Sequence, residues 1–344
     1  MNTRRYFFFL FFILFGVTLV AGSFSLLKNS PRTAGEKNLT PLSLAFDWTP
    51  NTNHTGIYVA LARNWYAEEG IDLKLIPYSG TVATDVVVNA GTVDLGISST
   101  EAITADAAAG APVVSIAAII AHNTSSLAVV KDSGIMRPAQ LEGKIYGGYG
   151  APFEEPVVGT MIKTDGGTGV FKNVTLNVDP LEALRSKRID FSWIFDAWQG
   201  VEAKRSGLAL TTFPVNEYGI PDYSTPNIIT SPDTLEKKKD ALRKFMRATA
   251  RGYEYARAYP REAAQMLIDA APAGTFPDEG LVFESQEYLS PRYADEGKKW
   301  GVQTRESWRD YPAFMIANKA VFDAEGKPVT AMDFDALYTN ELFE

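Results

Sequence analysis

Short apolar segments alternate with helix-length segments from Pro41 onward, and this alternation restricts the fold more than any other feature of the sequence. The expected strands are 42–46, 71–76, 94–98, 113–120, 127–130, 144–149, 174–177, 190–195 and 227–230. The expected helices among them are 56–69, 81–89, 101–109, 155–164 and 180–186. Because strands separated by helices of roughly 10–15 residues form βαβ units, the sequence predicts an α/β fold with mostly parallel sheets.

The strands fall into two cycles, with the short runs 127–130 and 227–230 between them. Long charged helices follow, including 237–259, with no convincing further strand. We interpret this order as two lobes joined by two crossovers, each lobe a mostly parallel sheet flanked by helices, with a ligand cleft where the carboxyl ends of the sheets face each other. The expected lobes are 41–125 plus 230–344 (lobe one) and 126–229 (lobe two).

The N-terminus carries an export pattern. Two arginines precede an apolar run at residues 6–21, which is typical of an export signal, and an A-x-S arrangement allows cleavage after Ser23. The run is also close to the ~20 residues of a membrane span, so an uncleaved anchor stays open. We therefore expect residues 1–23 to be a signal peptide or membrane anchor and residues 24–40 a polar tether. The expected location is exported, either periplasmic or on the outer face of the cell membrane.

Composition excludes several classes of function. The 344 residues include no cysteine, which removes disulfides, thiolate zinc sites, iron–sulfur clusters and cysteine nucleophiles. The net charge is −8 and no basic block is present, which argues against nucleic acid as a partner. The two histidines form no catalytic order or metal-ligand spacing. We expect no metal, no cofactor and no catalytic residue.

Two polar segments follow predicted strands of lobe one. In the first, Asp47, Asn51 and His54 surround Trp48, a combination that suits an aromatic heterocycle through stacking and edge hydrogen bonds. The alternative for this segment is a capped helix start with Trp48 in the core. In the second, Ser98 and Ser99 open a helix, where hydroxyl and backbone N–H groups hold ligand carbonyls or an anion, or merely cap the helix.

A glycine-rich segment follows the strand 144–149 of lobe two. Its glycines, Gly150 among them, permit close backbone approach, Tyr149 and Phe153 offer ring faces, and Glu154 or Glu155 accepts hydrogen bonds from ring N–H groups. The alternative is a tight turn before a helix, and both readings are compatible. The segment is not a nucleotide phosphate-binding motif.

The last strand of lobe two ends in two tryptophans, a phenylalanine and an aspartate. We expect Asp196 and Trp198 in the cleft, as a polar anchor and a ring face. Of Trp193 and Phe195, we expect one in the core because strand side chains alternate between faces, and we retain Trp193 as a candidate ligand contact.

These motifs carry a family resemblance. The runs DWTPNTNHTGIYVALARNWYAEEGIDL, VDLGIS and KIYGGYGAPFEEP resemble solute-binding proteins of the thiamin-pyrimidine and riboflavin importer group, over about residues 42–270. The resemblance implies a two-lobed periplasmic-binding-protein fold (type II) that delivers its ligand to the transmembrane subunits of an ABC permease. The family's phosphate-contacting glycine turn matches residues 150–153.

The same family includes a eukaryotic thiamin-pyrimidine synthase that consumes its own histidine and uses a pyridoxal-phosphate lysine. Carried over without gaps, the synthase lysine falls on Ser98 and its histidine on Ala102, and its cysteine-rich segment has no counterpart here. We therefore expect a binding protein, not an enzyme. An exported enzyme with His54 as its base is a remote alternative.

The expected function is capture of a flat aromatic vitamin in the inter-lobe cleft for an ABC importer. Riboflavin is favoured slightly over the formylaminopyrimidine precursor of thiamin, because ring faces are abundant and the sequence has no lipid-anchor cysteine. The expected partners are this small heterocycle and the permease subunits. Association with the membrane would come through the permease or the N-terminal anchor.

Overall fold

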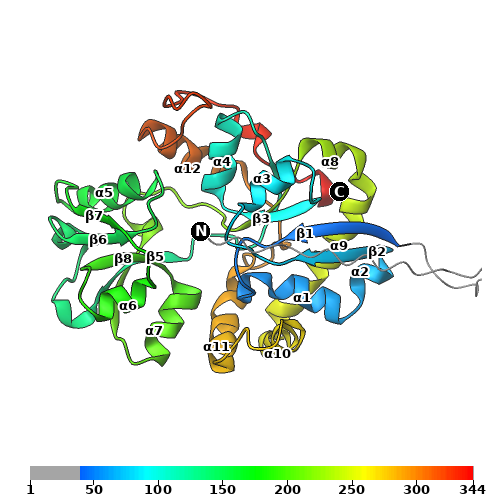
Figure 1. The fold of residues 1–344 in the computed structure, drawn as a ribbon, viewed down its shortest axis with the longest axis horizontal. Helices are drawn as coiled ribbons and strands as arrows, with labels where there is room; N and C mark the ends of the chain where they lie inside the picture. Colours follow the sequence, from blue (N-terminus) through cyan, green and yellow to red (C-terminus); the bar gives the residue numbers. More distant parts are fainter. Residues whose placement is uncertain (1–38, 344) are drawn as a thin grey trace, which may run out of the picture. The chain divides into compact units, whose positions relative to one another are not determined.

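The computed structural model describes residues 39–343, in which two five-stranded sheets each carry helices on both faces (Figure 1). The expected two-lobed α/β fold is confirmed. The expected signal or anchor, and nearly all of the expected tether, lie outside the described residues. Within residues 39–343, no helix combines the length and the apolar character needed to cross a membrane.

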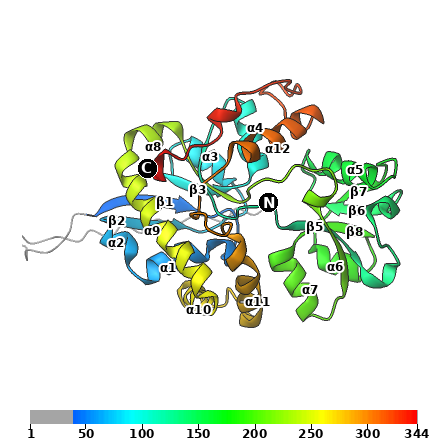
Figure 2. The same ribbon diagram turned by 180° about the vertical axis from the view of Figure 1, so that it is seen from behind.

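The first sheet has the strand order β2-β1-β3-β10-β4, and only β10 runs against its neighbours. In Figures 1 and 2, α3 and α4 lie on one face of this sheet and α1 and α9 on the other. The strands are β1 (Thr40–Ala45), β2 (Ile71–Ile76), β3 (Leu95–Ser98), β4 (Val114–Ala118) and β10 (Asn227–Thr230). The helices of this lobe are α1 (Thr55–Ala62), α2 (Trp65–Glu68), α3 (Thr84–Asn89), α4 (Thr100–Ala108), α8 (Pro232–Lys237), α9 (Lys239–Ala258), α10 (Pro260–Ala270), α11 (Glu279–Leu289) and α12 (Arg305–Ala317).

The second sheet repeats this pattern with the order β7-β6-β8-β5-β9, in which β5 is the antiparallel strand. Figure 1 places α5 on one side of the sheet and α6 and α7 on the other. The strands are β5 (Ser125–Val130), β6 (Ile145–Gly148), β7 (Lys172–Thr175), β8 (Phe191–Phe195) and β9 (Leu210–Pro214). The helices are α5 (Glu154–Thr164), α6 (Pro180–Arg185) and α7 (Val201–Arg205).

The antiparallel strand of each sheet is the first strand that the chain forms after crossing between the sheets. β5 follows the first crossover, and β10 follows the second and pairs with β3 and β4. The expected lobe boundary at residues 229 and 230 is therefore a few residues late, because Asn227–Thr230 as a whole belongs to the first sheet. An apolar run of this length reveals a strand but not the sheet that receives it.

Two other expectations need correction. The single helix expected at 56–69 is interrupted between α1 and α2 at Asn64, whose φ of 58° is left-handed. The sequence did not predict β9, because this edge strand contains two threonines, of which Thr212 is exposed, and ends in Pro214, a composition that resembles a loop.

The long helix α9 packs directly on α1. An added Cβ at Gly252 of α9 would stand 1.9 Å from the carbonyl oxygen of Gly56 in α1, so only glycine permits this approach of the two backbones. Tyr253 stacks on Trp300 beside this contact, with ring centroids 4.1 Å apart. The two helices thereby form one rigid layer beneath the first sheet.

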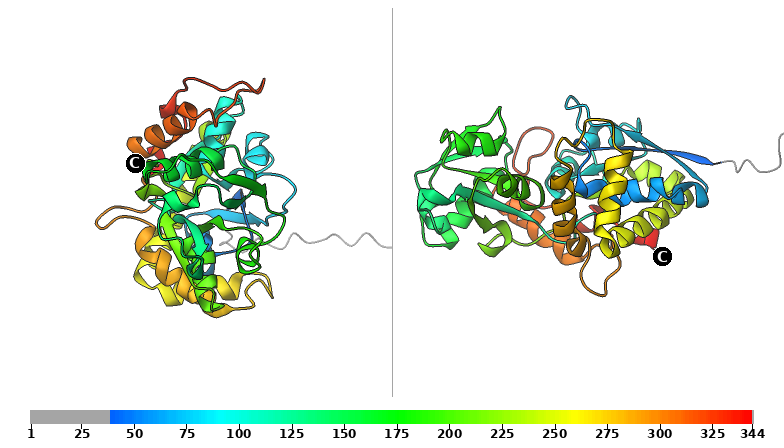
Figure 3. Two further views of the ribbon diagram at one scale, coloured as in Figure 1. Left: turned by 90° about the vertical axis from the view of Figure 1, so that its left-hand side faces the viewer. Right: turned by 90° about the horizontal axis from the view of Figure 1, so that it is seen from below.

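Helix α11 lies against the second lobe, beside α7 (Figure 3). Arg205 at the end of α7 pairs with Asp278, just before α11, at 2.7 Å and with Glu284 of α11 at 2.5 Å. Near the other end of the lobe contact, Tyr311 and Met315 of α12 pack in the same hydrophobic cluster as Phe191 of β8. The C-terminal helices, expected in lobe one, thus contact both lobes.

Candidate ligand-binding site

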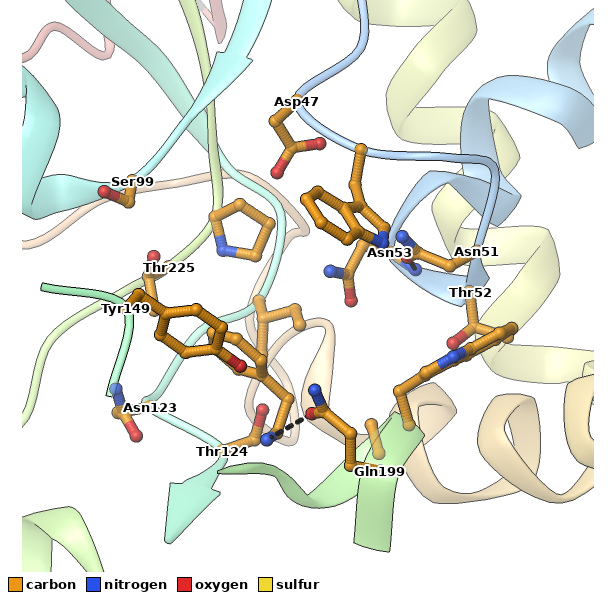
Figure 4. Close-up of a pocket in the computed structure, with 16 residues that line it drawn as sticks. Asp47, Asn51, Thr52, Asn53, Ser99, Asn123, Thr124, Tyr149, Gln199 and Thr225 are labelled. Carbon is orange, nitrogen blue, oxygen red and sulfur yellow. Dashed lines mark hydrogen bonds between the residues drawn. The ribbon is translucent and has the colours of Figure 1, made fainter. Parts of the chain in front are cut away.

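A cavity of about 250 Å³ lies between the two lobes (Figure 4). Its walls come from the segments that follow β1, β3, β6 and β8, and its remaining residues come from the two crossovers, so it occupies the expected position at the carboxyl ends of the strands. The lining residues are Asp47, Trp48, Asn51, Thr52, Asn53, Ser99, Ile120, Asn123, Thr124, Tyr149, Phe195, Ala197, Trp198, Gln199, Thr225 and Pro226. Six of the predicted site residues are brought together here: Asp47, Trp48, Asn51, Ser99, Tyr149 and Trp198.

Trp48 presents its ring at the cavity. The side chain is 56% exposed, which excludes the alternative of a core residue, and it leans on Tyr78 with ring centroids 4.9 Å apart. The loop below it is ordered by Asn51, whose side chain accepts a hydrogen bond from the backbone N–H of Asn53 and donates one to the carbonyl of Thr49. This loop therefore holds an exposed ring in a defined orientation.

Asp47 is oriented by His54. Nε2 of His54 lies 3.1 Å from Oδ1 of Asp47, while Nδ1 accepts a hydrogen bond from the backbone N–H of Asn51 at 3.3 Å. His54 is fully buried and stacks on Phe46 with ring centroids 4.5 Å apart. This arrangement requires the neutral tautomer that carries its proton on Nε2. His54 itself does not line the cavity, in contrast to the expectation, but contacts Asp47, which does.

Glu154 stabilises the glycine-rich turn and does not reach the cavity. Its buried carboxylate accepts hydrogen bonds from the backbone N–H groups of Tyr149 and Ala151, at 2.9 and 2.7 Å, and from the hydroxyl of Tyr146 at 2.7 Å. Because these donors occupy both oxygens, Glu154 cannot read a ligand in this arrangement. Tyr149, which the turn presents, is half exposed and points into the cavity (Figure 4).

The neighbouring glycine and phenylalanine also lie outside the cavity. Gly150 has a φ of 84°, and an added Cβ would lie 3.1 Å from the hydroxyl of Thr175, so its role is in the turn. Phe153 packs edge-on against Trp193, with ring centroids 5.9 Å apart. Trp193 is buried in the core of the second lobe, and the expectation that it contacts a ligand is not met by its position.

The end of β8 sends alternate side chains to opposite faces of the sheet. Phe195, 49% exposed, lines the cavity, while Asp196 points away from it, accepts a hydrogen bond from the hydroxyl of Ser126 at 2.9 Å and lines a separate depression with Tyr288. Burial raises the pKa of Asp196 to about 6. The π-helical turn Asp196–Gly200 then returns Trp198 and Gln199 to the cavity.

Several lining residues were missed by the sequence reading. Asn123 and Thr124 come from the first crossover and Thr225 from the second, and Gln199 accepts a hydrogen bond from the backbone N–H of Phe195 at 2.8 Å (Figure 4). Both crossovers are polar runs without a motif. The two-lobe prediction itself offered the signal, because crossovers between two lobes must pass the cleft.

A second chamber of about 400 Å³ adjoins the first and shares Asp47 and Ser99 with it. Ser98 lines this chamber only, and Ser99 caps α4 by accepting a hydrogen bond from the backbone N–H of Ala102. Ser98 and Ala102, the two positions that correspond to the synthase lysine and histidine in the resemblance, both line it. Within residues 39–343, no group of three or more His, Asp or Glu side chains is arranged to hold a metal ion.

Two sheets of this topology with a cavity between them are the fold of periplasmic binding proteins. The solved structure of the periplasmic aliphatic sulphonate binding protein SsuA from Escherichia coli superposes with a TM-score of 0.65 and 12% sequence identity, over 88% of this chain and 99% of that chain. The chain belongs to the family described as NMT1/THI5 like, whose profile matches residues 51–263.

Two relatives named for pyrimidines resemble most of the chain. The formylaminopyrimidine-binding protein of Halalkalibacterium halodurans is 26% identical over 305 residues, which cover 87% of this chain and 90% of the relative. The 4-amino-5-hydroxymethyl-2-methylpyrimidine phosphate synthase of Legionella pneumophila is 27% identical over 235 residues, covering 67% of this chain and 74% of the relative. The expectation that favoured riboflavin is not supported by these relatives.

Proposed function

We propose that this protein is the exported solute-binding component of an ABC importer and that it captures formylaminopyrimidine or a closely similar aminopyrimidine. The observation that carries the proposal is the inter-lobe cavity, where exposed aromatic rings from both lobes face an oriented carboxylate. Relatives and fold neighbours named for solute binding support the same assignment.

Ring capture rests on four aromatic side chains. Trp48 comes from lobe one, and Tyr149, Phe195 and Trp198 come from lobe two. A flat ligand that stacks on Trp48 and on a ring of lobe two at the same time bridges the two lobes. Each aromatic pair contributes about 0.5–1.5 kcal/mol beyond the burial of area, so stacking from both sides couples ligand binding to closure.

Recognition of the ring edge rests on Asp47 and the amides. The Asp47 carboxylate accepts hydrogen bonds from the exocyclic amino group of an aminopyrimidine, and His54 holds it in place for this role. Asn123 and Gln199 offer amide N–H donors to ring nitrogens, because the side-chain oxygen of Asn123 already accepts from Ser125 and that of Gln199 accepts from Phe195. A pyrimidine that lacks the amino group leaves the Asp47 carboxylate desolvated and without a partner, which is a strong basis for selection.

The size of the cavity favours a single ring. A volume of about 250 Å³ lies at the small end for ligand sites and suits one six-membered ring with short substituents. The relatives named for pyrimidines favour the pyrimidine over riboflavin.

Catalysis by His54 has no geometric support. His54 is fully buried and both of its ring nitrogens are engaged within the protein, so it has no free nitrogen to accept a ligand proton. Ser98 and Ala102 also lack the amine and imidazole that the synthase resemblance requires at these positions. We propose binding without turnover.

The direct test is calorimetric titration of the purified protein with formylaminopyrimidine and with riboflavin. We expect saturable binding of the pyrimidine, unchanged ligand recovered after denaturation, and weaker or no binding of riboflavin. Tight binding of riboflavin alone would overturn the choice of ligand. Absence of binding to both, together with tight binding of an alkyl sulfonate, would overturn the vitamin-related function.

A further inference from the structure

The second chamber continues the inter-lobe cavity toward helix α3. It shares Asp47 and Ser99 with the cavity, so an arm attached to a ring in the cavity can enter it past these two residues. The rest of its lining comes from the segment before α3, the start of α3, the end of β3 and the start of α4. These elements belong to one lobe, so the chamber does not depend on closure.

The lining is acidic and rich in hydroxyl groups. Asp47 and Asp85 are its charged residues, Thr81, Thr84 and Ser98 supply hydroxyls, and none of its described lining residues is Lys, Arg or His. Asp85 is buried, and its carboxyl group contacts that of Asp106 on α4. The chamber therefore presents negative charge without a compensating cation.

Asp106 on α4 stands beside Asp85. One buried oxygen of Asp106 has no donor among the described residues apart from the neighbouring carboxyl group. Burial first, and then the hydrogen bond and charge of Asp85, raise the pKa of Asp106 to about 8. Asp85, which lines the chamber, thus lies next to a carboxyl group whose pKa is raised.

Ser98 gives an independent indication that the chamber receives a polar group. The residue is 6% exposed, and its hydroxyl lines the chamber without a hydrogen bond to another described residue. Ser98 lies two residues beyond Gly96, whose added Cβ would meet Thr84 of α3, so both positions face the same side of the sheet. A buried hydroxyl aimed into an adjoining chamber is satisfied when a ligand group bonds to it.

We propose that this chamber binds a primary ammonium group carried on a short arm of the ligand whose ring occupies the inter-lobe cavity. The proposal rests on the proposed function and, among the aminopyrimidines proposed there, favours a ligand whose arm ends in a free primary amine over the N-formyl compound. Asp85 and Asp47 supply the charge, and the hydroxyls of Ser98, Thr81 and Thr84 accept the N–H bonds. The first turns of α3 and α4 would favour an anion, but Asp85 and Glu101 already occupy those turns, and a full carboxylate charge exceeds the partial charge of a helix end.

The test compares three ligands that share the 4-amino-2-methylpyrimidine ring and differ in the arm at C5: aminomethyl, N-formylaminomethyl and phosphorylated hydroxymethyl. Calorimetric titration at neutral pH measures each Kd with the purified protein. We expect the aminomethyl compound to bind at least about tenfold more tightly than the formyl compound, and the phosphate ester to bind most weakly. In Asp85→Asn, the ratio of the first two should fall to within about threefold, because the charge is removed with little change in shape.

Two further variants keep the test decisive. Asp72→Asn removes an exposed carboxylate at the start of β2, the opposite end of the sheet from the cavity, and should preserve the preference. Ala102→Leu fills the chamber from α4 and should weaken binding of the aminomethyl compound more than binding of the same ring with a methyl group at C5. This variant provides a test even if Asp85→Asn does not fold. Equal or tighter binding of the formyl compound, or an unchanged preference in Asp85→Asn, would overturn this inference alone. Failure of all three pyrimidines to bind would overturn the proposed function as well.

Discussion

His54 and Asp47 form a hydrogen-bonded pair in which one residue is fully buried and the other is one-third exposed at the cavity, with Nε2 3.1 Å from Oδ1. The buried member has no access to a ligand, and the exposed member has no other oriented support within residues 39–343. The backbone N–H of Asn51 fixes the opposite ring nitrogen. A rigid chain of contacts therefore connects the loop after β1 to the carboxylate that we assign to ring recognition.

Replacement of His54 by Phe should weaken ligand binding without removing any ligand contact. Phe retains the stacking on Phe46 but loses both hydrogen bonds, so Asp47 gains rotamer freedom and we expect Kd to rise about tenfold. In a double-mutant cycle with Asp47→Asn, the second substitution should add little to the first. Additive effects in the calorimetric Kd would show that His54 does not act through Asp47.

Replacement of Trp48 by Ala should cost about 2 kcal/mol of binding free energy, or roughly 30-fold in Kd, because the variant lacks the exposed ring on which the ligand stacks. Titration by calorimetry gives the change directly. Tyr259→Ala is the matched control, since that ring is similarly exposed and does not line the cavity. An equal, small effect of both substitutions would contradict the assignment of Trp48.

Replacement of Glu154 by Gln should affect stability more than binding. The amide turns an N–H group toward backbone donors, and one buried bond is lost at a cost of about 1–3 kcal/mol. Chemical denaturation with and without ligand separates the two effects. Glu155→Gln is the control, because the Glu155 carboxylate accepts a hydrogen bond only from the exposed Asn173 side chain among the described contacts. A large rise in Kd at unchanged stability would make Glu154 a ligand contact after all.

His122 should make stability depend on pH in the alkaline range. It lies in the first crossover and bonds Asp222 of the second through Nδ1, and Asp295 of lobe one through Nε2 at 2.9 Å. The hydrogen bond to Asp222 is the largest cause that raises the pKa of His122 to about 9, above its unfolded value of about 6.5. Its contribution is thus complete below pH 6.5, declines as the pH rises and is lost above about 9.

Melting temperatures of the protein and of His122→Gln at pH 6 and pH 9.5 check this sign. At pH 6 the melting temperature of the unaltered protein should be higher than that of the variant, and this difference in melting temperature should be smaller at pH 9.5. Since half of the His122 side chain is exposed, solvent screening keeps the difference modest. A difference that grows with pH would contradict the charged state of His122.

Most of the fold and part of the site could be predicted from the sequence. Strands such as Ile71–Ile76 and Asn227–Thr230 were predictable because apolar runs between turn signals are local features. The direction of a side chain at a strand end is not local: Phe195 and Asp196 are neighbours, and only the pairing of β8 with β5 decides which one faces the cavity. The segments that contain Glu154 and His54 were predicted correctly. The hydrogen-bonding groups of both side chains are occupied within the protein, however, and sequence spacing alone does not reveal this.

The position of β10 in the first sheet has a consequence for biosynthesis. Within the described part of that sheet, β10 is the strand that pairs with β4, and it lies more than a hundred residues downstream; single bridges join β4 to the still later Gly301 and Tyr338. While the chain emerges from the ribosome or a translocation channel, β4 has no strand to pair with until β10 has appeared, which is after the whole of β5–β9. The second sheet is built from one continuous stretch and needs no later residue to complete its pairing. The order of emergence therefore favours a second lobe that matures first, around which the first lobe closes its apolar β4 edge last.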